Sequence, residues 1–156
     1  MEIAYIKTPL GTAKISGNDN GIASISILEE GTITKNIPTV LKEAAKQLHD
    51  YFNGKRTYFD FELQPQGTKF QQKVWQALLE IPFGKTCSYM ELSKKLGDVK
   101  AIRAVASANG KNPLWIVVPC HRVIGTDGSL TGYAGGLWRK KWLLEHESSA
   151  KQQSLF

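Results

Sequence analysis

The chain contains little cysteine: Cys87 and Cys120 are the only two among 156 residues. A small secreted fold held together by disulfides needs more thiols than this, and so does a cysteine-rich zinc site. The count argues against both classes, and we expect both thiols to be free.

Long apolar runs are also absent. No stretch reaches about 18 apolar residues, the length that a membrane-spanning helix requires. The first residues, MEIAYIKTPLG, lack the charged segment followed by an apolar segment that marks a secretory signal. We therefore expect a cytoplasmic protein that does not associate with a membrane.

Negative charge is scarce in the second half of the chain. Residues 66–156 hold 13 Lys and Arg against 6 Asp and Glu, a net charge of +7, whereas residues 1–65 carry a net charge of −1. Such an imbalance favours a polyanionic partner such as DNA, although a solvated cationic face has the same composition.

The first half predicts a small antiparallel sheet with one helix. Apolar and polar residues alternate in EIAYIK, GTAKIS and GIASISIL, and turn residues separate these segments. Apolar residues recur at helical spacing from Thr39 to Phe52, and alternation returns in TYFDFEL. The polar stretch QPQGT is a candidate linker, so we expect one domain over residues 1–65 and a second over residues 66–156.

The second half predicts a mainly helical domain with a helix-turn-helix, which makes the fold class α+β. One apolar stripe begins at Phe70 and ends at IPFG. In SYMELSKKL, Ser88 and Glu91 have the spacing of a capping box. Gly97 then supplies a turn before a second helix, AIRAVASAN, which Gly110 closes. Many such hairpins bind nothing, but the lysines in and beside this one favour DNA.

The second helix of the pair lacks the side chains that read base edges in the major groove. Around Arg103 it has only Ala, Ile, Val and Ser. So slim a helix fits a minor groove, where one long arginine can act as a wedge. The alternative is that Arg103 is a solvated surface residue.

Cys120 stands at the end of an apolar run in NPLWIVVPCHRVIG. The proline before it favours extended geometry, so we expect LWIVV to form a short buried strand that ends at the thiol. A buried thiol in apolar surroundings is inert unless a neighbour lowers its pKa. His121 is the candidate base, and Glu147 or Glu145 would orient its ring. Adjacent residues of a strand face opposite ways, so a turn or a bridging water would be needed to connect Cys120 to His121.

The segment TGYAGG has glycines on both sides of a tyrosine, which makes a turn or lets backbone amides approach a planar ligand. This segment occurs with four others: GTKFQQKVWQALLEIPFGKTCSY, KAIRAVASANGKNP, VPCHRVIG and, overlapping it, GYAGGLWRKKWLLEHE. In their order and spacing, these segments resemble the O6-alkylguanine-DNA alkyltransferase family over residues 67–147. The resemblance implies direct-reversal repair: the alkyl group of O6-alkylguanine, and of O4-alkylthymine, moves once from flipped-out DNA onto the protein.

The resemblance also implies a role for each reactive residue. Cys120 would accept the alkyl group, His121 would take the thiol proton through a water molecule, and Glu147 would orient His121. Tyr89 would contact the target phosphate and donate to guanine N3, while Arg103 would fill the stack left by the flipped base.

Further residues complete the site that the resemblance implies. Asn112 would brace the turn between the DNA-contacting helix and the cysteine. The carbonyls of Cys120 and Val123 would accept from the exocyclic amine of guanine, and the Ala134 amide would face O6 beside Tyr133. The other helix residues expected at the DNA are Ala104, Ser107 and Lys111. The partner would be double-stranded DNA, bound mainly through the minor groove by a monomer.

Two features depart from many members of that family. Residues 1–65 have no cysteine and only His49, whereas some relatives bind zinc there, so we expect no metal and no cofactor. Trp115 stands where many relatives have a small residue or proline, and it either narrows the pocket for bulky adducts or lies in the core.

Two other function classes remain open. A cysteine hydrolase would use Cys120, His121 and Glu147 over many turnovers and would not need Arg103. A lesion-binding or transcription-regulating helix-turn-helix module would not need the thiol.

Overall fold

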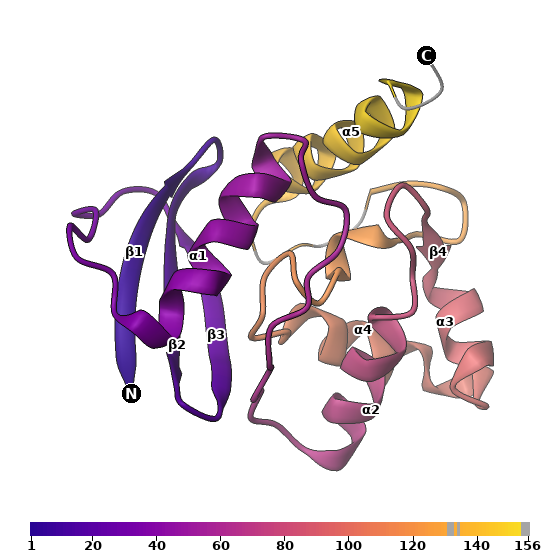
Figure 1. Ribbon diagram of the computed structural model, residues 1–156. Coiled ribbons are helices and arrows are strands. Elements are labelled where there is room, and N and C mark those ends of the chain that lie inside the picture. The colour runs from indigo at the N-terminus through magenta and orange to yellow at the C-terminus, as the bar shows by residue number, and fades with distance from the viewer. Residues whose placement is uncertain (131–132, 134, 154–156) are drawn as a thin grey trace. The chain divides into compact units, whose positions relative to one another are not determined.

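The computed structural model describes residues 1–130, 133 and 135–153 (Figure 1). Its contacts divide the chain into two compact units. The first comprises residues 1–66 and 113–117, and the second comprises residues 67–112 and 118–156. Pro113–Val117 therefore belongs to the first unit. A single domain boundary near residue 65, which the sequence predicted, assigns this segment to the second unit instead.

A three-stranded antiparallel sheet forms the first unit, as the alternation predicted. β1 (Glu2–Thr8), β2 (Gly11–Asn18) and β3 (Gly21–Leu28) pair in chain order. The tight connections use Gly11 and Gly21, whose φ angles of 132° and 141° suit glycine alone. Buried residues alternate along β1 and along most of β2, which gives the sheet one apolar face, whereas β3 buries Ile22 and Ile25, three positions apart.

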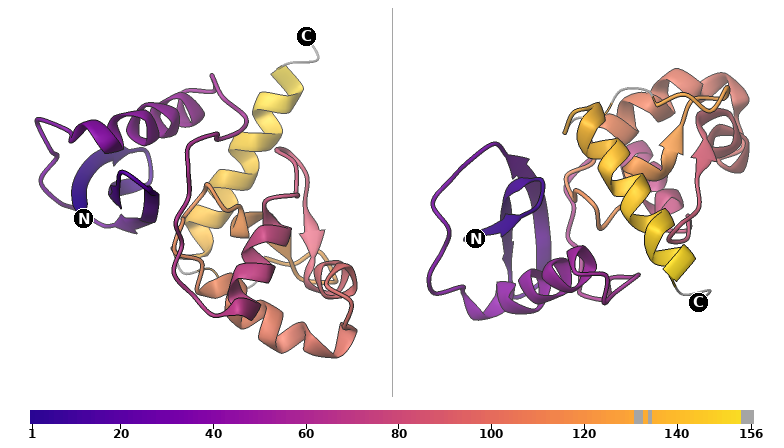
Figure 2. Two further views of the ribbon diagram at one scale, coloured as in Figure 1. Left: turned by 60° about the horizontal axis from the view of Figure 1, so that its bottom comes forward. Right: turned by 90° about the horizontal axis from the view of Figure 1, so that it is seen from above.

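Helix α1 (Thr39–Phe52) covers that apolar face of the sheet, and the views of Figure 2 show it on this side only. Its bounds are those that the sequence predicted. The apolar residues at helical spacing are the buried ones: Leu41, Ala44, Ala45, Leu48 and Tyr51. Burial of this stripe against the sheet, more than intrinsic helix propensity, stabilises α1.

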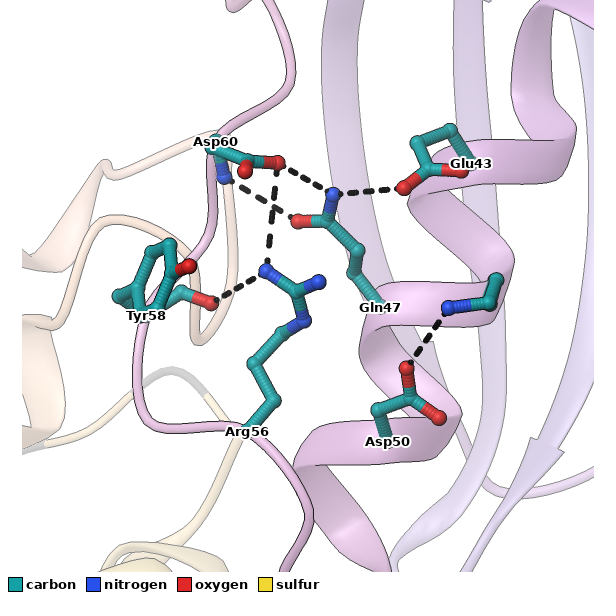
Figure 3. Close-up of polar contacts among 7 residues, drawn as sticks. Glu43, Gln47, Asp50, Arg56, Tyr58 and Asp60 are labelled. Atoms are coloured by element: carbon teal, nitrogen blue, oxygen red, sulfur yellow. Dashed lines mark hydrogen bonds and ion pairs between the residues drawn. The ribbon is translucent and has the colours of Figure 1, made fainter.

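The strand predicted from TYFDFEL does not form. Within residues 57–63 only Leu63 makes a bridge, to Ile22. Side chains instead hold the segment to α1 (Figure 3): buried Gln47 donates to Asp60 and accepts from the Asp60 backbone amide at 3.1 Å. Arg56 donates to the Tyr58 carbonyl at 3.2 Å. These bonds use backbone groups that a strand would have needed for its ladder.

Four helices form the second unit: α2 (Lys69–Leu78), α3 (Tyr89–Lys95), α4 (Ile102–Gly110) and α5 (Leu137–Gln153). Two short parallel strands, β4 (Cys87–Ser88) and β5 (Val123–Ile124), and two 3₁₀ turns, η1 (Val99–Ala101) and η2 (Cys120–Arg122), connect them. Helix α4 packs against both α2 and α3, and α5 packs against η2.

The predicted helix-turn-helix is formed by α3 and α4. The Ser88 hydroxyl accepts from the Glu91 amide, and the Glu91 carboxylate accepts from the Ser88 amide, which is the expected capping box. Gly97 takes a φ of 91° at the turn. Helix α4 ends at Gly110 as expected, although Gly110 is still helical and not in the left-handed region.

Within the described residues, no helix combines the length and the apolar character needed to cross a membrane.

Candidate active site

The backbone before Cys120 is a series of tight turns, so the prediction of a strand over LWIVV is wrong. Only Leu114 makes a bridge, to Ile25. At Ile116 φ is 71°, and the Val117 amide donates to the Trp115 carbonyl at 2.9 Å. A β-branched residue in this conformation costs about 1–3 kcal/mol. Burial holds it there, since Ile116 is 1% exposed.

A second tight turn delivers the cysteine. Pro119 has φ −80° and ψ 63°, and the Cys120 amide donates to the Val118 carbonyl at 2.8 Å. Cys120, His121 and Arg122 then form one turn of 3₁₀ helix. Successive side chains of such a turn point about 120° apart. The opposite-facing geometry expected for Cys120 and His121 in a strand therefore does not apply.

Burial dominates the environment of the thiol. Cys120 is 7% exposed, and this burial raises the pKa of its thiol above the ordinary value. Hydrogen bonds from Asn112 and Tyr133 and the positive charge of Lys140 lower that pKa without overcoming the burial. In the DNA-free protein the thiol therefore keeps its proton at neutral pH, and a base must remove that proton before the sulfur reacts.

His121, Arg122 and Glu147 form a buried polar cluster. His121 Nε2 and Glu147 Oε2 are 2.8 Å apart. Arg122 donates two hydrogen bonds to the same carboxylate, from Nε to Oε1 at 2.8 Å and from Nη2 to Oε2 at 3.0 Å. Its third nitrogen, Nη1, donates to the Ile81 carbonyl at 2.7 Å. The paired fork geometry makes this a strong, orienting contact.

The electrostatics of the cluster set the protonation state of His121. Burial opposes ionisation of Glu147, but the hydrogen bonds and charges of His121 and Arg122 outweigh it and hold the pKa of Glu147 far below its usual range. Burial, with the charges of Arg122 and Lys140, lowers the pKa of His121 despite Glu147. At neutral pH the imidazole is therefore neutral, and the ionised Glu147 places its single proton on Nε2.

The second ring nitrogen, Nδ1 of His121, is thus the basic one. It is buried, and among the residues described here it has no hydrogen-bond partner. A general base needs a neutral histidine with one ring nitrogen that can accept a proton and a carboxylate hydrogen-bonded to the other ring nitrogen, and His121 has both.

The lowered pKa of His121 predicts a loss of stability in mild acid. Below pH 6.5 the unfolded chain binds a proton at this residue before the folded chain does, so the free energy of unfolding falls as pH falls. Urea unfolding at pH 7, 6 and 5 measures this slope, and Glu147 stays ionised over that range. His121→Gln should flatten the slope, and an unchanged slope in that variant would contradict the assignment.

One face of α4 is exposed in the same unit. The four helix residues predicted to contact DNA are all solvent-exposed: Arg103, Ala104, Ser107 and Lys111. Val105 and Ala108 face inward at 0% and 2% exposure. The exposed face is narrow and carries cations without a base-reading amide, so it suits contact with a phosphate backbone or a minor groove.

Comparison with known proteins decides the family. Residues 69–149 match the model described as the DNA binding domain of 6-O-methylguanine DNA methyltransferase, and residues 1–65 match the ribonuclease-like domain of the same protein. The chain belongs to the 6-O-methylguanine DNA methyltransferase family.

Curated relatives within the family are similar over nearly their whole length. The methylated-DNA–protein-cysteine methyltransferase of Methanosarcina barkeri is 45% identical, with 96% of this chain and 98% of that protein covered. The protein of the same name from Mycobacterium tuberculosis H37Rv is 46% identical, with 92% and 90% covered. A crystal structure of Mycobacterium tuberculosis OGT in complex with DNA superposes with a TM-score of 0.88 at 45% identity, covering 96% of this chain and 94% of that one.

The other predicted site residues of this family member lie as follows. The Asn112 amide donates to the Val118 carbonyl at 2.7 Å, across the turns that lead to the cysteine. Val123 is buried in β5, and its amide donates to the Cys120 carbonyl. Tyr89, half-buried, is the first residue of α3. Ala134 lies outside the described residues.

The geometry decides one alternative from the sequence, the carboxylate at His121, and places the residue of another, Trp115. Glu147 is the carboxylate at His121, since Glu145 is exposed and pairs with Lys141 at 4.0 Å. Trp115 belongs to the first unit, 6% exposed, with its ring 6.2 Å from that of Phe52. This burial is the core placement that the sequence offered as one of two alternatives. The other alternative, that Trp115 narrows the pocket for bulky adducts, stays a prediction.

Sequence reasoning missed two buried cations of the site, Arg122 and Lys140. Lys140 is fully buried on α5, and its charge lowers the pKa of Cys120. Arg122 directly follows the predicted residue His121, and Lys140 lies seven positions, or about two helical turns, before Glu147 on the same face of α5. A cation at each such position could have been noticed, but burial could not be read from the sequence.

In the described part of the chain, no three His, Cys, Asp or Glu side chains gather closely enough to hold a metal ion.

Proposed function

We propose that this chain repairs DNA by direct reversal, taking the alkyl group from O6-alkylguanine onto Cys120 and leaving intact guanine. The observation that carries the proposal is the buried thiol that shares one short turn with a neutral histidine backed by Glu147 and Arg122. Membership of the family and the exposed cationic face of α4 support the same assignment.

The chemical step is a displacement at the alkyl carbon. The Cys120 sulfur forms a bond to that carbon while the bond from carbon to guanine O6 breaks. The thiol proton passes through a water molecule to His121 Nδ1, and Glu147 and Arg122 hold the ring in place as it becomes charged. The leaving guanine carries the displaced electron pair, and Tyr89 donates to its N3 while the Ala134 amide faces O6.

The base must leave the duplex before this step. The alkylated oxygen lies inside the stack, and extruding a weakly paired lesion costs a few kcal/mol. Arg103 occupies the space that the base leaves, and Ala104, Ser107 and Lys111 contact the DNA around it, mainly in the minor groove. The carbonyls of Cys120 and Val123 accept from the exocyclic amine. The same pocket takes O4-alkylthymine, and the protein acts as a monomer.

The product limits the protein to one reaction. A thioether has no easily displaced group, so each molecule accepts one alkyl group and does not recover its thiol. The expectation of a cytoplasmic location stays a prediction.

Intact mass after incubation with duplex DNA containing O6-methylguanine tests the proposal. We expect the protein to gain the mass of one methyl group, and Cys120→Ala to gain none while still binding the duplex. Cys87→Ala is the matched control and should gain one methyl group. Repeated turnover with an unmodified protein would indicate a hydrolase, and binding without any gain in mass would indicate a lesion-binding module; either result overturns the proposal.

A further inference from the structure

Asn109 is a buried polar residue that the proposed chemistry does not yet use. It lies in the last turn of α4 and is 2% exposed. Its amide nitrogen Nδ2 donates to the Tyr89 hydroxyl oxygen at 3.3 Å. Its carbonyl oxygen Oδ1 is also buried and, in the described part of the structure, has no hydrogen-bond partner.

An unpaired buried amide oxygen destabilises the folded state, because it loses its hydrogen bonds to water without replacing them. An apolar side chain of similar volume would avoid that cost and pack against α3 equally well. The amide therefore has a use other than packing, and its one side-chain hydrogen bond among the described residues is to the Tyr89 hydroxyl.

The backbone around both residues is already fixed by other contacts. The capping box of Ser88 and Glu91 sets the start of α3, and Tyr89 is its first residue. The Trp75 indole donates to the Ala108 carbonyl at 2.8 Å, which fixes the last turn of α4 beside Asn109. What these contacts leave undetermined is the direction of the Tyr89 O–H bond.

We infer that Asn109 is a positioning residue that makes Tyr89 a hydrogen-bond donor toward the DNA. By donating to the phenol oxygen, the amide occupies one of its lone pairs and turns the hydroxyl proton away from α4. Accepting one hydrogen bond also makes a hydroxyl a stronger donor. As negative charge builds on the departing guanine, part of it is shared by the phenol oxygen, where the Asn109 N–H stabilises it. This inference rests on the proposed role of Tyr89 in that step.

Single-turnover methyl transfer, measured with protein in saturating excess over duplex DNA, tests the inference. Asn109→Leu removes the donor and should lower the rate constant about tenfold, the effect expected from one hydrogen bond to a developing charge. Asn109→Asp keeps the size but offers only acceptors, so it turns the Tyr89 hydroxyl toward itself and should lower the rate at least as much. Ser93→Ala removes a buried hydroxyl of α3 that has no hydrogen-bond partner among the described residues, and it should leave the rate unchanged.

Two comparisons separate positioning from a merely structural role. In a Tyr89→Phe background, Asn109→Leu should change the rate by less than about twofold, because the hydroxyl through which it acts is gone. With O6-methyl-3-deazaguanine in the duplex, which has no N3 acceptor, Asn109→Leu should again have almost no effect. A tenfold loss that persists in either comparison overturns the inference. Wild-type protein that transfers no methyl group at all would instead overturn the proposed function.

Discussion

His121→Gln lowers the rate constant for methyl transfer by about 10²–10⁴-fold, the range expected when a general base is removed. The glutamine amide can still donate to Glu147, so it replaces the hydrogen bond of 2.8 Å between His121 Nε2 and Glu147 Oε2. It has no nitrogen that can accept a proton. The thiol, whose pKa burial raises, then lacks the base that the proposed mechanism assigns to it. Single-turnover kinetics at pH 7.5 with O6-methylguanine DNA measure the loss.

The control for this variant is the other histidine of the helical unit. His146 is half-buried and stacks on Trp142 with ring centroids 4.9 Å apart. His146→Gln should leave the rate within about twofold of wild type, because the proposed proton transfer does not use His146. DNA affinity of His121→Gln should be unchanged. A rate equal to wild type in His121→Gln would show that another group takes the thiol proton.

Arg122→Met is expected to produce the largest loss of stability, about 3–5 kcal/mol, or a fall in melting temperature of roughly 10 °C. The Arg122 side chain is 8% exposed and that of Glu147 is 1% exposed. Removing the guanidinium takes a positive charge and two hydrogen bonds from the buried Glu147 carboxylate, and it also takes this donor from the Ile81 carbonyl. Chemical unfolding at pH 7.5 measures the free energy directly.

Two further variants sharpen the Arg122 result. Lys141→Met removes a cation from an exposed pair with Glu145 on α5, whose side chains are 68% and 67% exposed, and should cost under about 1 kcal/mol. Arg122→Lys keeps the charge but cannot grip both carboxylate oxygens, so its stability should lie between Arg122→Met and wild type. If Arg122→Met is no less stable than Lys141→Met, the buried cluster does not depend on Arg122.

Much of the fold could be predicted because local pattern and tertiary packing agree. Helix α1 has the bounds that its apolar spacing indicated, and the capping box at Ser88 starts α3 where expected. The three strands of the sheet were predicted from alternating apolar and polar residues, and the burial pattern follows that alternation in β1 and in most of β2. In these elements the burial pattern and the intrinsic preferences of the residues favour the same structure.

The failures occur where a side chain or a tight turn replaces regular hydrogen bonding. Residues 57–63 alternate like a strand, yet Gln47 from α1 takes the Asp60 amide. LWIVV is rich in β-branched residues, yet Ile116 adopts a left-handed φ, which no propensity favours. Both outcomes depend on groups far along the chain, which a local pattern does not contain.

The reactive cluster was partly predictable for a related reason. Cys120, His121 and Glu147 could be named from residue types and from the family resemblance. Arg122 and Lys140 could not, because the sequence does not distinguish a buried cation from the many solvated ones in this basic half. The sequence predicted a buried thiol but not whether its neighbours outweigh the effect of burial on its pKa, since that balance depends on residues far from it in sequence.

The return of Pro113–Val117 to the first unit has a consequence for the order of events during synthesis. The Ile25 amide at the edge of β3 bonds to the Pro113 carbonyl at 2.8 Å, and the Trp115 amide bonds back to the Ile25 carbonyl at 3.0 Å. The N-terminal unit therefore stays incomplete on the ribosome until Val117 has emerged from the exit tunnel. By then α2, α3 and α4 have already been translated. Cys120 follows Val117 by three residues, so the nucleophile emerges just after the N-terminal unit can complete its fold.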